Sequence, residues 1–254
     1  MTIMIALKRI ILLCFLFPLL AVATSQDTLI VSYGDHNSAP YAVEQGEVLY
    51  SGIIKDIATE IADELDISIS FFKTPRKRTE RYLENETVHV VIISNPAWFD
   101  NSNKLQWSET IFVEKDIIVT RADNTHNYQK LADFKGMIIG TIRGYTYPNL
   151  QPFFDQEHFI RYDVSNLQVN FIRLELNRID AVVDADVAIN YQLLKSEKPK
   201  AYRVLPIVVS EHNIQAALSP NAPVSLEDFN KALIKLKEQG VIAAILKKYQ
   251  LEEK

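Results

Sequence analysis

The sequence alternates between short apolar strands and amphipathic helices, and this alternation limits the folds open to the chain. Residues 28–33 are a run of apolar and β-branched residues, which predicts a strand. In the segment that follows, Ile53, Ile57 and Ile61 recur at helical spacing. An alternating strand and helix order favours a mostly parallel sheet covered by helices. The elements predicted in this part are strands at 28–33, 67–72 and 88–94 and helices at 52–65 and 76–83.

The alternation starts again after a strand-rich stretch at 111–120. No flexible linker separates the two αβ units, so we predict two lobes joined by short strands, with a hinge and a cleft. Ligands bind such sheets at the carboxyl ends of the strands, which directs attention to the loops 34–41 and 95–99. The further predicted elements are strands at 137–141, 179–183, 202–207 and 213–219, helices at 164–176, 185–195, 225–238 and 242–249, and a helix beginning at 149.

The N-terminal segment has the layout of a cleaved secretory signal. Lys8 and Arg9 precede an apolar run at 10–23, which ends in a small-x-small pattern, Ala21-Val22-Ala23. A membrane anchor is the alternative, but this run is shorter than the about 20 residues that a spanning helix needs. We therefore predict a signal peptide at residues 1–25 and a periplasmic location for the rest.

The residue inventory argues against several kinds of chemistry. The formal net charge of −5 disfavours nucleic acids and anionic membranes as partners. The one cysteine, Cys14, lies in the apolar run, so the mature chain offers no disulfide and no thiolate ligand. The histidines lack metal-ligand spacing, and neither a Gly-rich phosphate loop nor a G-x-S-x-G motif is present. We therefore predict no metal, no cofactor and no catalytic residue.

Several stretches of the sequence occur in an order that is typical of one protein family. They are Pro40-Tyr41 followed by 51–57, Leu83 to Val91, Trp107 to Ile111, Leu131 to Gly144, Asn177 to Val183, and Gly240 to Leu251. On these stretches the sequence resembles the periplasmic solute-binding proteins of family 3, the amino-acid-type substrate-binding proteins of ABC transporters. Each stretch alone is a weak signal, and their shared order carries the resemblance.

The resemblance implies an α/β fold of the type II periplasmic-binding-protein kind, in which two αβ lobes joined by crossing strands close on a ligand. It implies a discontinuous first lobe, residues 26–119 and 211–254, and a second lobe, residues 120–210. It also implies a monomer that captures a small polar or anionic solute, an amino acid or a related molecule, for an ABC permease. Two alternatives stay open: a binding protein that serves a membrane sensor, and a dehydratase-type enzyme on the same fold.

The arginine that the resemblance would lead one to expect is absent from its usual place. Amino-acid-binding members of the family carry a Thr-x-x-Arg pattern after the third strand, and its arginine holds the ligand carboxylate. Here residues 95–99 read Asn-Pro-Ala-Trp-Phe. This departure predicts weak binding of ordinary α-amino acids. The nearest substitute is Arg78, which either reaches the cleft or belongs to a solvated basic face with Arg76, Lys77 and Arg81.

A second candidate anion site is the loop after the predicted strand 137–141. The resemblance implies backbone N–H groups and a helix N-terminus that face the ligand here. Tyr145 could instead pack within its lobe. The predicted ligand-binding residues of this loop are Arg143, Gly144, Tyr145 and Thr146.

Acids and aromatic residues complete the predicted site. Asp184 and Asp186 flank the position at which the resemblance implies an acid for a ligand ammonium, and Asp186 is alternatively the cap of the next helix. Tyr41 and Trp98 are candidates for an aromatic wall, and Trp98 alternatively covers the core. The remaining candidates, which offer hydrogen bonds to a polar ligand, are Ser94 and Asn95.

Overall fold

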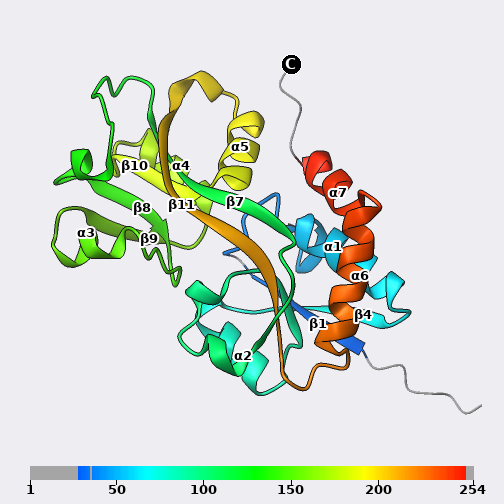
Figure 1. The fold of residues 1–254 in the computed structure, drawn as a ribbon. Helices are drawn as coiled ribbons and strands as arrows, with labels where there is room; N and C mark the ends of the chain where they lie inside the picture. The colour runs from blue at the N-terminus through cyan, green and yellow to red at the C-terminus, as the bar shows by residue number, and fades with distance from the viewer. Residues whose placement is uncertain (1–27, 35, 250–254) are drawn as a thin grey trace, which may run out of the picture.

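One long sheet runs through the two lobes of the molecule (Figure 1). The computed structural model describes residues 28–34 and 36–249, and the predicted signal peptide at 1–25 lies outside them. The α/β class and the two-lobed arrangement predicted from the sequence are confirmed. In spatial order the strands are β4 (Ser68–Lys73), β1 (Thr28–Tyr33), β5 (Val90–Ser94), β11 (Tyr202–Leu218), β7 (Phe112–Arg121), β10 (Ala181–Ala185), β8 (Ile138–Ile142) and β9 (Ile160–Val164), with β6 (Gln106–Trp107) paired to β11.

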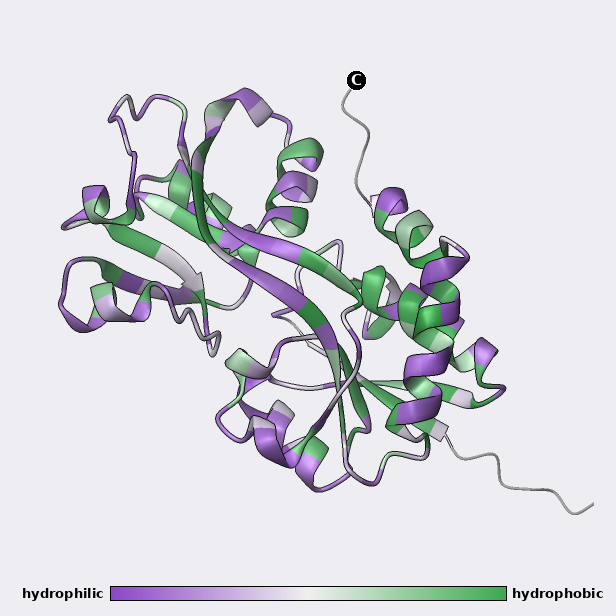
Figure 2. Cartoon of the chain, in the orientation of Figure 1, coloured by the Kyte–Doolittle hydropathy of each residue, from purple (hydrophilic) through white to green (hydrophobic). Residues whose placement is uncertain are grey.

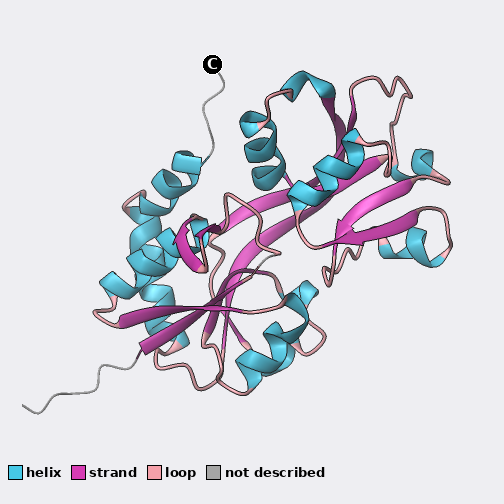
Figure 3. Cartoon of the chain, turned by 180° about the vertical axis from the view of Figure 1, so that it is seen from behind, coloured by secondary structure: helices cyan, strands magenta, loops and turns pink. Residues whose placement is uncertain are grey.

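Strands β7 and β11 cross between the lobes and pair antiparallel (Figure 3). The sequence predicts separate strands at 202–207 and 213–219, but β11 is a single strand of 17 residues. That prediction is wrong because the polar middle of β11 continues its pairing with β7, from Val208 to Glu211, across two register shifts. Hydrogen bonds to β7 keep this stretch extended. An apolar pattern in the sequence cannot predict a strand that depends on pairing with a distant strand.

In the first lobe, α1 (Ile53–Glu64) packs against the parallel strands β1, β4 and β5, and α6 (Leu226–Glu238) and α7 (Val241–Tyr249) pack against α1. The isoleucines that predict the first helix, including Ile53 and Ile57, are fully buried in the main core cluster with Phe229 and Leu233. Hydrophobic residues accordingly gather where these helices meet (Figure 2). Tyr249 fastens the last helix to the first, because its hydroxyl accepts a hydrogen bond from the Gly52 N–H at 2.9 Å. The helices of this lobe are α1 (Ile53–Glu64), α2 (Thr79–Glu84), α6 (Leu226–Glu238) and α7 (Val241–Tyr249).

In the second lobe, α4 (Leu167–Glu175) and α5 (Asp186–Lys195) pack against β10, and α4 also packs against β8. The sequence predicts a helix over 164–176, but β9 occupies the segment up to Val164. Asn166 then caps α4 by accepting a hydrogen bond from the Val169 N–H at 3.1 Å. β9 lies at the edge of the sheet, and its first residue, Ile160, is 54% exposed. β9 therefore lacks the alternation of buried and exposed residues that is typical of a strand with one buried face.

Smaller elements connect these parts. A separate hairpin precedes α1, and short 3-10 helices lie in several loops of the described part of the chain. No helix among the described residues is long and apolar enough to cross a membrane. The smaller elements are β2 (Val43–Gln45), β3 (Val48–Ser51), α3 (Gln151–Asp155), η1 (Arg76–Arg78), η2 (Pro96–Trp98), η3 (Ser102–Lys104), η4 (Leu131–Phe134) and η5 (Pro199–Ala201).

Candidate functional site

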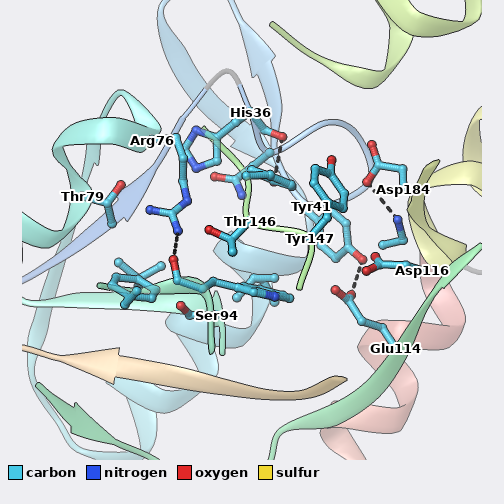
Figure 4. Close-up of a pocket in the computed structure, with 17 residues that line it drawn as sticks. His36, Tyr41, Arg76, Thr79, Ser94, Glu114, Asp116, Thr146, Tyr147 and Asp184 are labelled. Atoms are coloured by element: carbon cyan, nitrogen blue, oxygen red, sulfur yellow. Dashed lines mark hydrogen bonds between the residues drawn. The ribbon is translucent and has the colours of Figure 1, made fainter. Parts of the chain in front are cut away.

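A cavity lies between the lobes, at the carboxyl ends of β1 and β5 and beside the crossing strands (Figure 4). This is the place where ligands bind in sheets of this kind. Both lobes contribute to its wall. The lining residues are His36, Asn37, Tyr41, Arg76, Thr79, Val91, Ile93, Ser94, Trp98, Phe99, Glu114, Asp116, Tyr145, Thr146, Tyr147, Asp184 and Ala185.

Arg76 is the arginine that lines the cavity. It begins η1, and one of its Nη atoms donates a hydrogen bond to the Trp98 carbonyl oxygen at 2.6 Å. Its guanidinium lies 4.9 Å from the centre of the Phe99 ring, a cation–π contact. Burial lowers the pKa of Arg76 from its ordinary value. A guanidinium offers five N–H donors, so those not used by Trp98 remain for an anionic group in the cavity.

Thr79 lies next to this arginine at the start of α2. Its side chain is only 3% exposed, and its hydroxyl has no hydrogen-bond partner within the part of the chain that the structure describes. A buried hydroxyl without a partner is costly and therefore uncommon. A bound solute that contacts Arg76 would be placed to satisfy it.

Glu114 of β7 lines the cavity from the other side. Tyr41 donates a hydrogen bond from its hydroxyl to Glu114 Oε2 at 2.5 Å. Burial, reinforced by nearby Asp116, Asp186 and Asp184, raises the pKa of Glu114 to about 8, against the opposing effect of the Tyr41 hydrogen bond. The carboxyl group is therefore protonated over part of the neutral range.

Asp184, the fourth residue of β10, is a second buried acid in the cavity. Its Oδ1 accepts a hydrogen bond from the Ala185 N–H at 2.9 Å. Burial raises the pKa of Asp184 to about 7, and the nearby charge of Asp116 adds to this effect, while the Ala185 hydrogen bond opposes it. Both pKa values are raised mainly by burial, with nearby carboxylates adding to the effect, so this side of the cavity favours the neutral form of the two acids.

Asp116 connects the two crossing strands. Its Oδ2 accepts a hydrogen bond from Ser210 Oγ at 2.5 Å and lies 2.9 Å from His212 Nε2. The His212 ring in turn meets the Trp98 ring edge to face, with centroids 5.1 Å apart. Asp116 and Trp98 line the cavity, and Ser210 and His212 of β11 contact these two residues from behind the wall.

The loop 34–41 joins the first lobe to the second. Tyr145 donates a hydrogen bond from its hydroxyl to the His36 carbonyl oxygen at 3.1 Å. The Leu167 N–H, at the N-terminus of α4, donates to Ser38 Oγ at 3.0 Å. Gly144, at a φ of +83°, packs against η1, and a Cβ there would lie 3.3 Å from Arg76 Cγ. These contacts join the two lobes in the arrangement that we call closed.

Replacing Ser38 with alanine is expected to weaken solute binding about two- to tenfold, because the closed arrangement loses one hydrogen bond that spans the lobes. Isothermal titration with a ligand of the protein measures this. The matched control is Ser225→Ala, which removes a cap within a single lobe, where Ser225 Oγ accepts from the Asp228 N–H at 3.1 Å. That variant should lose stability but keep its affinity. Equal affinity losses in both variants would contradict the assignment.

Comparison of the sequence with known protein families identifies one that matches most of the chain. A model of the bacterial extracellular solute-binding proteins, family 3, matches residues 30–252. The chain belongs to this family. The resemblance predicted from the sequence is thereby confirmed, and the members of this family bind solutes outside the cytoplasm. No individually curated protein matches the chain in a sequence search.

Solved structures of two amino-acid-binding proteins and of one ligand-binding core have the same fold. An ancestral arginine-binding protein bound to arginine matches with a TM-score of 0.73 at 21% identity, covering 87% of this chain and 97% of the other. The GluR0 ligand-binding core from Nostoc punctiforme, in complex with L-glutamate, has a TM-score of 0.72 at 19% identity, covering 87% and 98%. An ancestral amino acid-binding protein described as a precursor of cyclohexadienyl dehydratase has a TM-score of 0.73 at 19% identity, covering 88% and 95%.

Six of the residues predicted from the sequence of this family 3 protein line the cavity. They come from both lobes, and their contact with a solute stays a prediction. The structure brings together Tyr41, Ser94, Trp98, Tyr145, Thr146 and Asp184.

The other predicted residues do not line the cavity. Arg78 and Arg143 have exposed side chains, and an Nη atom of Arg78 lies 3.5 Å from the Tyr82 hydroxyl. Asn95 caps η2 by accepting from the Ala97 N–H at 2.9 Å. The remaining two have other contacts: Gly144 lies against η1, and Asp186 accepts hydrogen bonds from the Val187 and Lys115 N–H groups.

Several residues that line the cavity are not predicted from the sequence. The sequence does not distinguish Arg76 from Arg78, because both lie in one basic run and only the turn of η1 determines which of them faces the cavity. Glu114 and Asp116 did carry a signal. They are charged residues spaced by two on a predicted strand, so they share one face of the sheet. Charge on one strand face amid apolar residues is a usable sign of a functional strand.

Proposed function

We propose that this protein captures a small polar solute of the amino-acid type, with an anionic group, by closing its lobes around it. The observation that supports this is the position of Arg76, which lies in the interlobe cavity with N–H donors to spare beside the unpartnered Thr79 hydroxyl. Three structural neighbours carry arginine, glutamate or amino-acid binding in their names, which agrees with a solute of this class.

The protein acts after export to the periplasm and delivers its solute to an ABC permease, as a binding protein without catalysis. The basic and apolar N-terminal segment supports export. The family supports delivery, since its description names extracellular solute-binding proteins.

A thermal-shift screen of the purified protein against amino acids, organic acids, polyamines and sugars tests this proposal. A ligand at about a hundred times its dissociation constant is expected to add roughly 2.7 kcal/mol of stability. Small-angle scattering should then show a smaller radius of gyration with ligand than without it, because the lobes close. Absence of a shift with every amino acid and organic acid would overturn the proposal.

A further inference from the structure

The charged residues of the cavity lie at opposite ends. Figure 4 shows Arg76 and Thr79 on one side and Glu114, Asp116 and Asp184 on the other. Each end is therefore suited to a group of one charge.

The ion pair shown at the acidic end joins His212 to Asp116. Glu114 and Asp184, only 4% and 8% exposed, are instead hydrogen-bonded by the Tyr41 hydroxyl and the Ala185 N–H, which carry no positive charge. His212 contacts Asp116 and the Trp98 ring, and it lies opposite Glu114 in the pairing of β7 with β11. Buried carboxyl groups are costly to ionise unless a positive charge compensates them. A cationic group from the solute would supply that charge.

The space between the two ends is walled mainly by aromatic and apolar side chains. Tyr41, Tyr147 and Thr146 stand between the charged groups in Figure 4. Val91, Ile93 and the ring of Trp98 also line the cavity. Such a wall fits a methylene chain and offers it no charge.

We propose that the cavity selects solutes with an anionic group at one end, a cationic group at the other and an apolar spacer between them. Arg76 and Thr79 hold the anion, and Glu114, Asp116 and Asp184 hold the cation. This inference rests on the proposed function and narrows its solute class to ω-amino acids and amino acids with a basic side chain.

Two isomers test the separation of charge directly. 5-Aminopentanoate carries its charged groups at opposite ends of the chain, whereas norvaline carries both on its α-carbon. Pentanoate and pentylamine each supply one end, and L-lysine supplies both ends with an additional α-amino group. Titration calorimetry should show 5-aminopentanoate or L-lysine binding at least about tenfold more tightly than norvaline, pentanoate and pentylamine, because charge-assisted hydrogen bonds form at both ends.

The isosteric variant Glu114→Gln tests the acidic end. It should weaken binding of the charge-separated ligands about tenfold or more and leave that of pentanoate within about twofold. The matched control is Glu211→Gln, at an exposed acid of the neighbouring crossing strand. Asp184→Asn provides a second variant if Glu114→Gln lowers the unfolding temperature of the free protein.

The outcomes separate the two proposals. Norvaline binding as tightly as 5-aminopentanoate and L-lysine would overturn the selection for separated charges and leave the proposed function standing. An unchanged affinity of both Glu114→Gln and Asp184→Asn for L-lysine would also overturn it. Failure of every amino acid and organic acid to bind would overturn the proposed function itself.

Discussion

Replacing Arg76 with methionine is expected to weaken solute binding about thirtyfold or more while the chain stays folded. Truncating one partner of a buried, hydrogen-bonded charge pair typically costs about 2–5 kcal/mol, and 2 kcal/mol corresponds to about thirtyfold. Methionine keeps an unbranched apolar stem against the Phe99 ring but offers no N–H group to an anion. Titration calorimetry with the best ligand of the screen measures the loss.

The neighbouring arginines provide matched controls for this prediction. Arg78→Met and Arg143→Met remove the same charge from exposed side chains that do not line the cavity. Each should change the affinity by about twofold at most, since exposed charges are screened by water and salt. A loss in Arg143→Met that exceeds the loss in Arg76→Met would contradict this placement of the anion and support the loop 143–146 instead.

A stability measurement separates binding from folding in the Arg76 variant. Arg76 also donates to the Trp98 carbonyl oxygen, so its loss should lower the free energy of unfolding by about 1–3 kcal/mol. Urea unfolding of the free protein measures this cost. A variant that is folded at the temperature of the titration and has nevertheless lost its affinity supports a direct role for Arg76 in the site.

The predictions from sequence succeeded where burial produces a regular pattern. The isoleucines of α1 recur at helical spacing because one face of that helix is buried, and the predicted helix at 52–65 corresponds to α1 at Ile53–Glu64. The predicted helix at 225–238 corresponds to α6, and Ser225 caps it by accepting a hydrogen bond from the Asp228 N–H. These features depend on residues within one element, so the sequence contains what determines them.

The predictions failed where partners distant in the chain determine the conformation. The polar middle of β11 stays extended because β7 pairs with it, from more than eighty residues away in the sequence. The choice between Arg76 and Arg78 depends on the rotation of one 3-10 turn against the loop at 95–99. Neither the partner of a strand nor the orientation of a turn produces a periodic pattern of apolar residues in the sequence.

Binding of a solute with a cationic end is expected to release protons between about pH 5 and pH 8. In the free protein, burial raises the pKa of Glu114 to about 8 and that of Asp184 to about 7, so both carboxyl groups hold protons through much of this range. A cation placed between them favours their ionised forms and lowers both pKa values. Affinity should therefore rise with pH, by up to about tenfold per pH unit where one proton is released.

The free protein should show the opposite trend in stability. A carboxyl group whose pKa is higher in the folded than in the unfolded state binds more protons when folded. The free energy of unfolding therefore falls as the pH rises from about 4 toward 8, by at most about 1.4 kcal/mol per pH unit for each such group. The increase in the free energy of unfolding caused by the ligand should therefore grow over the same pH range in which the free protein becomes less stable.

Calorimetry in two buffers with different heats of ionisation, phosphate and Tris, counts the protons released at a given pH. Tyr41, Asp116, Asp184 and Asp186 act on Glu114, and His212, which contacts Asp116, lies opposite Glu114 in the pairing of β7 with β11. Glu114→Gln should reduce the release, whereas His212→Gln, which removes the one nearby histidine among these groups, should leave most of it. Proton uptake on binding, or an affinity that falls from pH 6 to pH 8, would show that the solute presents no cation to these acids, and the acidic end would then act only as a neutral hydrogen-bonding wall.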